Sequence, residues 1–125
     1  MMDETLKKVA EAWIKLNLAE RNSQEYEDLF WAYNQLSSFC DDEPEKCFET
    51  IRIIRSLNDS DVILSNLAAG PLEDMLVKHG ELFIDRIEAL AKNDPVYKKL
   101  LGAVWQNTIS DNIWKRIQAI AGPSW

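Results

Sequence analysis

The 125-residue sequence lacks the features that mark several large classes of protein. No apolar run approaches the ~20 residues that a membrane-spanning helix needs. Its amino end carries early acids and none of the apolar stretch of a secretory signal. We therefore expect a cytoplasmic protein without a membrane partner. Cysteine is also scarce, and without an export signal Cys40 and Cys47 are expected to be free thiols.

Signatures of catalysis and metal binding are equally sparse. The chain has one histidine, His79, and contains no GxGxxG, P-loop or GxSxG pattern. A single histidine and two cysteines seven positions apart do not form a recognised set of metal ligands. We expect no cofactor and no metal, and nothing in the sequence requires an enzyme.

Basic residues are too few for a nucleic-acid-binding protein. The chain has 14 Lys and Arg against 21 Asp and Glu, a net charge of −7, whereas phosphate contacts need clustered Lys and Arg. Residues 20–49 hold nine acids and two bases, a local charge that equals the net charge of the whole chain. This stretch is either a solvated face or a docking surface for a basic molecule.

Hydrophobic residues recur with a helical period from end to end, and sustained alternation is missing. We predict an all-α single domain, 1–125, with seven or eight short helices stacked in antiparallel pairs. The arrangement would be a short, HEAT-like α-solenoid or an irregular helical bundle. Expected helix starts include caps at Asn22 or Ser23, and at Asp42, Ser60, Asp94 and Ser110. The helix after Asp94 is expected to bury its periodic residues, Tyr97, Leu101 and Trp105.

Residues 67–80, LAAGPLEDMLVKHG, are expected to form a corner. Gly70 suits the end of one helix with a positive φ, Pro71 suits the start of the next, and Gly80 would end it. The alternative is a catalytic or ligand site formed by Glu73, Asp74 and His79, with Arg116 across the helices. Glu73 and His79 are six positions apart, so they cannot pair within one helix.

The predicted second helix, about 23–40, places one tryptophan on its polar side. Its expected core stripe is Tyr26, Leu29, Tyr33, Leu36 and Cys40. Trp31 lies opposite, among carboxylates and amides, which is the composition of an interface anchor with a charged rim. Alternatively, the helix packs on both faces and buries Trp31. The predicted partner-binding residues are Glu27, Asp28, Trp31, Asn34, Gln35, Asp41, Asp42, Glu43 and Glu45.

Several short motifs together resemble an uncharacterised, all-helical bacterial family of unknown function. These are FWAYNQL, LAAGPLEDML followed by HG, AKNDP, VW and IWKRI, spanning about residues 30–117, with Met75 where leucine is usual. The resemblance implies an all-helical fold and a bacterial origin, without an activity. It also implies that Glu73, Asp74 and His79 recur together, which keeps a site at 67–80 open.

The sequence favours a small protein–protein interaction module with a basic partner. Its most concrete form is an immunity protein that neutralises a basic toxin such as a nuclease. One alternative is a hydrolase or small-ligand-binding protein with its site at residues 70–80. Another is a structural or regulatory subunit that self-associates through Trp31 and Trp125. A monomer or a weak homodimer is expected.

Overall fold

The computed structural model describes residues 3–125, and within them all regular secondary structure is helical, as predicted. The described residues contain eight α-helices and one π-helical turn, η1. In chain order these are α1 Glu4–Leu18, α2 Gln24–Leu29, α3 Trp31–Asp42, α4 Pro44–Leu57, α5 Asp61–Leu67, η1 Ala68–Leu72, α6 Glu73–Asn93, α7 Pro95–Gly102 and α8 Asp111–Ile120.

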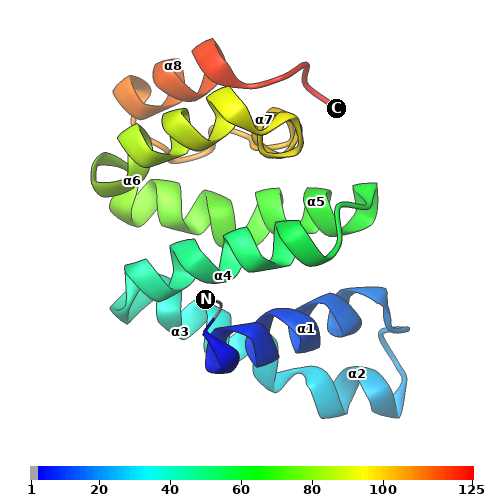
Figure 1. Cartoon of the computed structure of the whole chain (residues 1–125). Coiled ribbons are helices and arrows are strands. Elements are labelled where there is room, and N and C mark those ends of the chain that lie inside the picture. The colour runs from blue at the N-terminus through cyan, green and yellow to red at the C-terminus, as the bar shows by residue number, and fades with distance from the viewer. Residues whose placement is uncertain (1–2) are drawn as a thin grey trace.

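The helices form successive rows. In Figure 1, α1 and α2 lie at one end of the molecule and α7 and α8 at the other, with α4 and α6 between them. α1 packs on α3 and α4, α4 contacts α6, and α6 contacts α7 and α8. No helix within residues 3–125 has both the length and the hydropathy to cross a membrane.

Side-chain caps start most of the helices where the sequence places them. Ser23, Ser60, Asp94 and Ser110 each accept a hydrogen bond from a backbone N–H in the first turn of the next helix. The expected cap at Asp42 is wrong, because α3 continues through Asp42 and α4 starts with Pro44 at its first position. Proline can begin α4 without a cap because its fixed φ suits a first turn and it has no N–H to satisfy.

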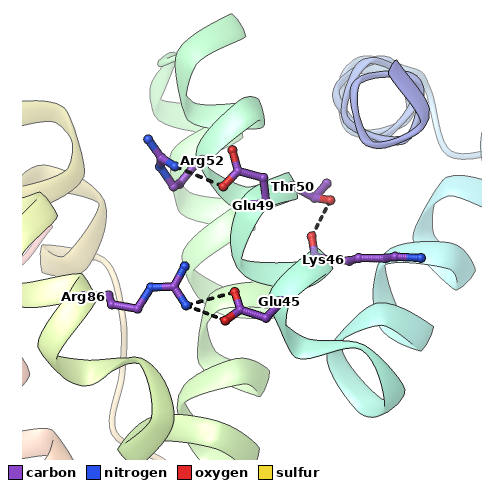
Figure 2. Close-up of polar contacts among 6 residues, drawn as sticks. All are labelled: Glu45, Lys46, Glu49, Thr50, Arg52 and Arg86. Atoms are coloured by element: carbon purple, nitrogen blue, oxygen red, sulfur yellow. Dashed lines mark hydrogen bonds and ion pairs between the residues drawn. The ribbon is translucent and has the colours of Figure 1, made fainter. Parts of the chain in front are cut away.

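One apolar cluster runs through the rows, and within it an aromatic pair joins α4 to α6. The rings of Phe48 and Phe83 stack with their centroids 5.0 Å apart. The Arg86 guanidinium covers this pair, 4.4 Å from the Phe48 centroid. The same arginine reaches back to Glu45 on α4, as Figure 2 shows. Helices far apart in sequence are therefore joined by both apolar and ionic contacts.

The predicted single helix over 23–40 is divided at Phe30, which separates α2 from α3. The packing of α3 on α1 and α4 buries Ala32, Leu36 and Phe39. This face is rotated from the predicted stripe, so Tyr33 is 53% exposed rather than buried. The error arises because one periodic pattern was extended across a turn, and tertiary packing then set the direction of α3.

The predicted helix end at Gly70 is wrong. α5 runs through η1 into α6 without a break, and Gly70 does not have a positive φ. Pro71 lies inside this run. A proline lacks the N–H and clashes with the carbonyl four residues before it, and a wider π-helical turn relieves both constraints.

The predicted boundary near residue 80 is present as a bend in α6. His79 has φ −137° and ψ 23° inside the helix, and the chain changes direction there. Gly80 also allows a close helix contact, because a Cβ at this position would lie 3.2 Å from Ile113 on α8. The glycine therefore serves interhelical packing rather than a left-handed turn.

The aromatic residue within α7 is buried, whereas the tryptophan that follows the helix is exposed. Tyr97 is buried as expected, but α7 ends at Gly102 and Trp105 is 69% exposed. The chain after α8 passes back across Gly102, where a Cβ would lie 2.4 Å from the Pro123 carbonyl oxygen. The Trp125 indole N–H then donates to the Lys99 carbonyl at 2.7 Å. The terminal tryptophan is thus anchored on α7 and still 42% exposed.

Candidate interaction surface on α2 and α3

Residues 20–35, here called the α2–α3 surface, form the least buried part of the helical array. α2 has no buried residue and packs mainly on α1 and α3 at one end of the molecule. Trp31, the first residue of α3, is 48% exposed. Half of this large side chain therefore remains open to solvent beside the carboxylates of α2.

Trp31 belongs to a larger group of exposed aromatic side chains than the sequence indicated. The rings of Tyr26 and Phe30 lie 5.8 Å apart, and those of Phe30 and Tyr33 lie 5.2 Å apart. Phe30 and Tyr33 are both exposed. The periodic stripe concealed Tyr33 by placing it in the core. The signal that could have found it is the density of four aromatics within residues 26–33.

The structure divides the acidic stretch into paired and unpaired carboxylates. Four of its acids form ion pairs within the chain, namely Asp41 with Lys78, Glu43 with Lys46, Glu45 with Arg86, and Glu49 with Arg52. Within residues 3–125, the acids of the stretch that form no ion pair are Glu20, Glu25, Glu27, Asp28 and Asp42. The uncompensated charge is therefore concentrated on α2 and the turn before it.

Figure 2 shows two carboxylates of the acidic stretch, both on α4, that are paired with arginines of α4 and α6. Both carboxylate oxygens of Glu45 accept from Nη1 of Arg86, at 2.6 and 2.9 Å. Glu49 accepts from Nη1 of Arg52 at 3.0 Å. Glu45, which the sequence predicts as a partner-binding residue, is thus already paired with Arg86 of α6. Nearer to Trp31, Asn34 is exposed and Gln35 is half-buried.

In the 67–80 segment, His79 caps the end of another helix. Its Nε2 lies 2.8 Å from the carbonyl oxygen of Cys40, near the end of α3. The backbone donor four residues beyond Cys40 would be residue 44, which is proline and has no N–H. Because a carbonyl can only accept, Nε2 carries the proton and donates. His79 therefore supplies the hydrogen bond that Pro44 cannot make.

The other candidate catalytic residues do not converge on His79. Glu73 accepts from Asn107 at 2.7 Å. Arg116 binds Glu88 through Nε at 3.0 Å and also binds Asp85. Hydrogen bonding from Arg116 lowers the pKa of Glu88, and the two carboxylates in turn raise the pKa of Arg116. Each of these side chains has a different partner, so the structure does not assemble them in one pocket.

Asp74 lies in an environment that disfavours the charged form of its carboxyl. It lines a small cavity of about 40 Å³ together with Trp13, Tyr33 and Cys40. Desolvation raises the pKa of its carboxyl, and the nearby Lys78 only partly opposes this effect. Lys78 is hydrogen-bonded to Asp41, which raises the pKa of the lysine. A cavity of this size has room for only a few water molecules.

The two cysteines are free and buried, in agreement with the sequence. A hydrogen bond from the Cys47 thiol lowers the pKa of Cys40, and the same contact raises the pKa of Cys47. Neither sulfur is open to solvent. Residues 3–125 contain no group of three His, Cys, Asp or Glu side chains arranged to hold a metal ion.

A second concave region lies at the opposite end of the molecule. It has a volume of about 480 Å³ and is formed by the end of α7, one face of α8 and the C-terminal segment. Trp105 and Trp114 line it together with Gln106 and Gln118. Sequence reasoning missed this groove because Trp105 was assigned to the core, and the groove depends on how α8 returns to α7.

These features define an all-helical protein with an acidic, aromatic surface at one end. The side chains of its 67–80 segment bind mainly to other parts of the same chain. The chain matches the family described as Family of unknown function (DUF6869) over residues 19–124, and it belongs to that family. The resemblance inferred from the sequence motifs is thereby confirmed. α1 lies outside the matched region, although it packs on α3 and α4. No curated protein and no solved structure matches the chain.

Proposed function

We propose that this protein is an interaction module that binds a basic protein through its α2–α3 surface. The observation that carries the proposal is the coincidence of unpaired carboxylates and exposed aromatics. Glu25, Glu27 and Asp28 lie on α2, directly before Phe30 and Trp31, and form no ion pair within residues 3–125. Elsewhere in the acidic stretch most carboxylates already have a cation.

The two components would have separate effects on binding. Uncompensated charge steers a basic partner toward the surface and raises the association rate, an effect that salt screens. A half-exposed tryptophan supplies a large apolar contact with little loss of side-chain entropy, and such residues dominate the energy of many interfaces. Trp31 would therefore act mainly on dissociation and the carboxylates mainly on association.

The most concrete form of the proposal is an immunity protein that neutralises a basic toxin such as a nuclease. A nuclease must attract phosphate and therefore carries clustered cations at its active site. An acidic inhibitor surface of about 800 Å² per partner could cover such a site. The unpaired acids of α2, close to Trp31, would make the contact. Glu43 and Glu45 would keep their ion pairs with Lys46 and Arg86.

Capture from lysate of the native host, followed by kinetics with the captured protein, tests the proposal. The test variant is Glu27→Lys with Asp28→Lys. The control is Asp59→Lys with Glu81→Lys, which changes the net charge equally at exposed positions outside the α2–α3 surface. We expect wild type and control to bind a basic protein, and the test variant to associate more slowly with a flatter dependence on salt.

Equal binding by the test variant would show that the partner uses another face. Equal losses in both variants would mean that net charge, rather than this surface, is responsible. Trp31→Ala then separates the anchor from the charge. We expect it to accelerate dissociation and to cost about 2 kcal/mol or more of binding free energy, with little change in association rate.

Self-association through Trp31 and Trp125 has a specific geometric requirement. Trp31 begins α3 near one end of the molecule, whereas Trp125 is anchored on α7 toward the other end. A contact between the two would either be head-to-tail, building a ring or a filament, or form an antiparallel two-fold dimer in which Trp31 of each copy contacts Trp125 of the other. Sedimentation of wild type and Trp31→Ala distinguishes this assembly from a monomer that binds a different protein.

A further inference from the structure

The two ends of the helical array carry opposite charge. The α2–α3 surface has four acids and one base, whereas residues 95–125 have four bases and one acid. We call this second region, which comprises α7, α8 and the segments that follow them, the α7–α8 end. Figure 1 shows α2 and α8 at opposite ends of the molecule. A chain that is acidic overall therefore has one basic end.

Ion pairs neutralise only part of this positive charge. Lys99 and Arg116 are paired with acids of other helices. Within residues 3–125, Lys98 and Lys115 form no ion pair, and both are exposed. Asp111, the one acid of this end, already accepts a side-chain hydrogen bond at 2.8 Å. The α7–α8 end thus keeps two lysines that are available to an acidic partner.

The same end contains the groove of about 480 Å³ between α7 and α8. Within residues 3–125, the lining of this groove includes no charged side chain. It does include Trp114 and the 69% exposed Trp105. The groove shares Ala121 with a second depression, of about 580 Å³, that Lys92 and Lys98 line. An uncharged aromatic groove therefore lies beside lysines.

This arrangement is complementary to the α2–α3 surface, where the unpaired Glu27 and Asp28 lie close to the half-exposed Trp31. Protein interfaces commonly combine an apolar centre with a charged rim, and opposite charges on the two rims fix the register of the contact. The groove volume falls within the range of about 300–1,000 Å³ that is typical of sites for whole small molecules. It is therefore large enough to receive an indole ring.

We propose that the α7–α8 end binds the α2–α3 surface of a second copy of this chain. Trp31 of one copy enters the groove of the other, and Glu27 and Asp28 face Lys98 and Lys115. The inference rests on the proposed function, because it uses the same acidic surface and makes a second copy one of its basic partners.

The contact differs from a pairing of Trp31 with Trp125, because the groove beside α8 is the receptor. It joins two different surfaces, so it either repeats head-to-tail or occurs twice in an antiparallel two-fold dimer. The net charge of −7 on each copy opposes the contact. We therefore expect a weak association that depends on protein concentration, and a basic protein that binds more tightly would displace the second copy.

Sedimentation equilibrium of the full chain, at concentrations up to about 1 mM, tests the self-association. We expect the weight-average mass of the wild type to rise with concentration. The acidic-surface variant, Glu27→Lys with Asp28→Lys, should raise the apparent Kd at least about tenfold. The basic-end variant, Lys98→Glu with Lys115→Glu, should do the same. A wild type that stays monomeric, or variants that associate as it does, would overturn the proposal.

An equimolar mixture of these two variants tests whether the two surfaces bind each other. Each variant has lost one surface, but the acidic surface of the basic-end variant can still meet the lysines of the acidic-surface variant. We expect the mixture to form a complex that neither variant forms alone, although both variants keep a net negative charge. A mixture that remains monomeric would overturn the proposal.

The control variant is Lys8→Glu with Lys15→Glu, which makes the same charge change as the basic-end variant at exposed positions of α1. It should associate like the wild type, and an equal loss in this control would overturn the proposal because net charge would explain the effect. Circular dichroism checks that each variant is folded. If the basic-end variant does not fold, Lys98→Gln with Lys115→Gln takes its place.

The result of the lysate capture separates this inference from the proposed function. A monomeric wild type that captures a basic protein through the α2–α3 surface would overturn the inference and leave the proposed function intact. Self-association that both variants abolish, without capture of any other basic protein, would support the inference and overturn the proposed role in binding a different protein.

Discussion

In the 67–80 segment most polar side chains have partners inside the chain, whereas on the α2–α3 surface they face solvent. His79 bonds the Cys40 carbonyl, Glu73 bonds Asn107, and Lys78 pairs with Asp41. On α2, by contrast, no residue is buried, and Glu25 and Glu27 form no ion pair in the described part of the chain. The contrast teaches that a dense cluster of unusual residues can have either role. A cluster is structural when other elements of the fold supply hydrogen-bond or ion-pair partners to its side chains, and it is a candidate binding surface when they do not.

The largest expected effect is on the apolar side of the 67–80 segment. Leu72 is fully buried at the junction of η1 and α6. Leu72→Ala should lower the free energy of unfolding by about 2–5 kcal/mol, because it removes buried methyl groups and leaves a cavity. Chemical denaturation measures the change, with the exposed Val77→Ala as a control. A loss no greater than that of the control would mean that this segment is not a structural centre.

The next effect concerns His79. His79→Ala should cost about 1–3 kcal/mol of unfolding free energy, because it leaves the Cys40 carbonyl without a donor beside Pro44. The neighbouring variant Lys78→Ala, which breaks an exposed ion pair, should cost less than about 1 kcal/mol. The two variants are compared by urea denaturation. Equal, small losses would argue against the capping role and renew interest in His79 as a functional group.

Asp74 is the exception that sharpens the comparison, since its carboxyl is partly desolvated. Its pKa is raised in the folded protein, so the native state holds the proton more tightly than the unfolded chain does. The pKa of an aspartate in the unfolded chain is about 3.9. As the pH rises from that value through the higher pKa of Asp74 in the folded protein, ionisation of Asp74 lowers the stability of the folded state.

Asp74→Asn should accordingly be slightly more stable than wild type at neutral pH, and the difference should vanish at lower pH. Thermal unfolding at a series of pH values measures both curves. A variant that is less stable than wild type at neutral pH would show that the Asp74 carboxylate makes a favourable contact. In that case this residue would resemble the rest of its segment.

The smallest expected effect on stability is at the α2–α3 surface. Glu27→Lys with Asp28→Lys should change the free energy of unfolding by no more than about 0.5 kcal/mol, because both side chains are exposed and without ion pairs. The same variant is expected to impair binding. A large loss of stability would break the comparison, since these acids would then be structural and their effect on binding indirect.

Much of the local structure could be predicted because its causes lie within a few residues. Ser60 and Asp94 are followed by the N–H groups that they cap, and the free thiols follow from composition. The polar neighbours of Trp31 left both an exposed and a buried position open, and only the packing of α3 decided for exposure. The predicted helix end at Gly70 failed because glycine and proline permit a break without requiring one, and packing kept the chain helical.

The sequence alone thus determined the all-helical class, most of the helix starts, the family and the acidic character of residues 20–49. All of these depend on composition, periodicity or contacts within one helical turn. The tertiary structure decided which acids remain unpaired, since Arg86 and Lys78 reach Glu45 and Asp41 across more than 35 positions of the chain. It also decided the turn at Phe30, the exposure of Trp105 and the burial of Tyr97. Those outcomes depend on which helices become neighbours, and that information does not reside in any one segment.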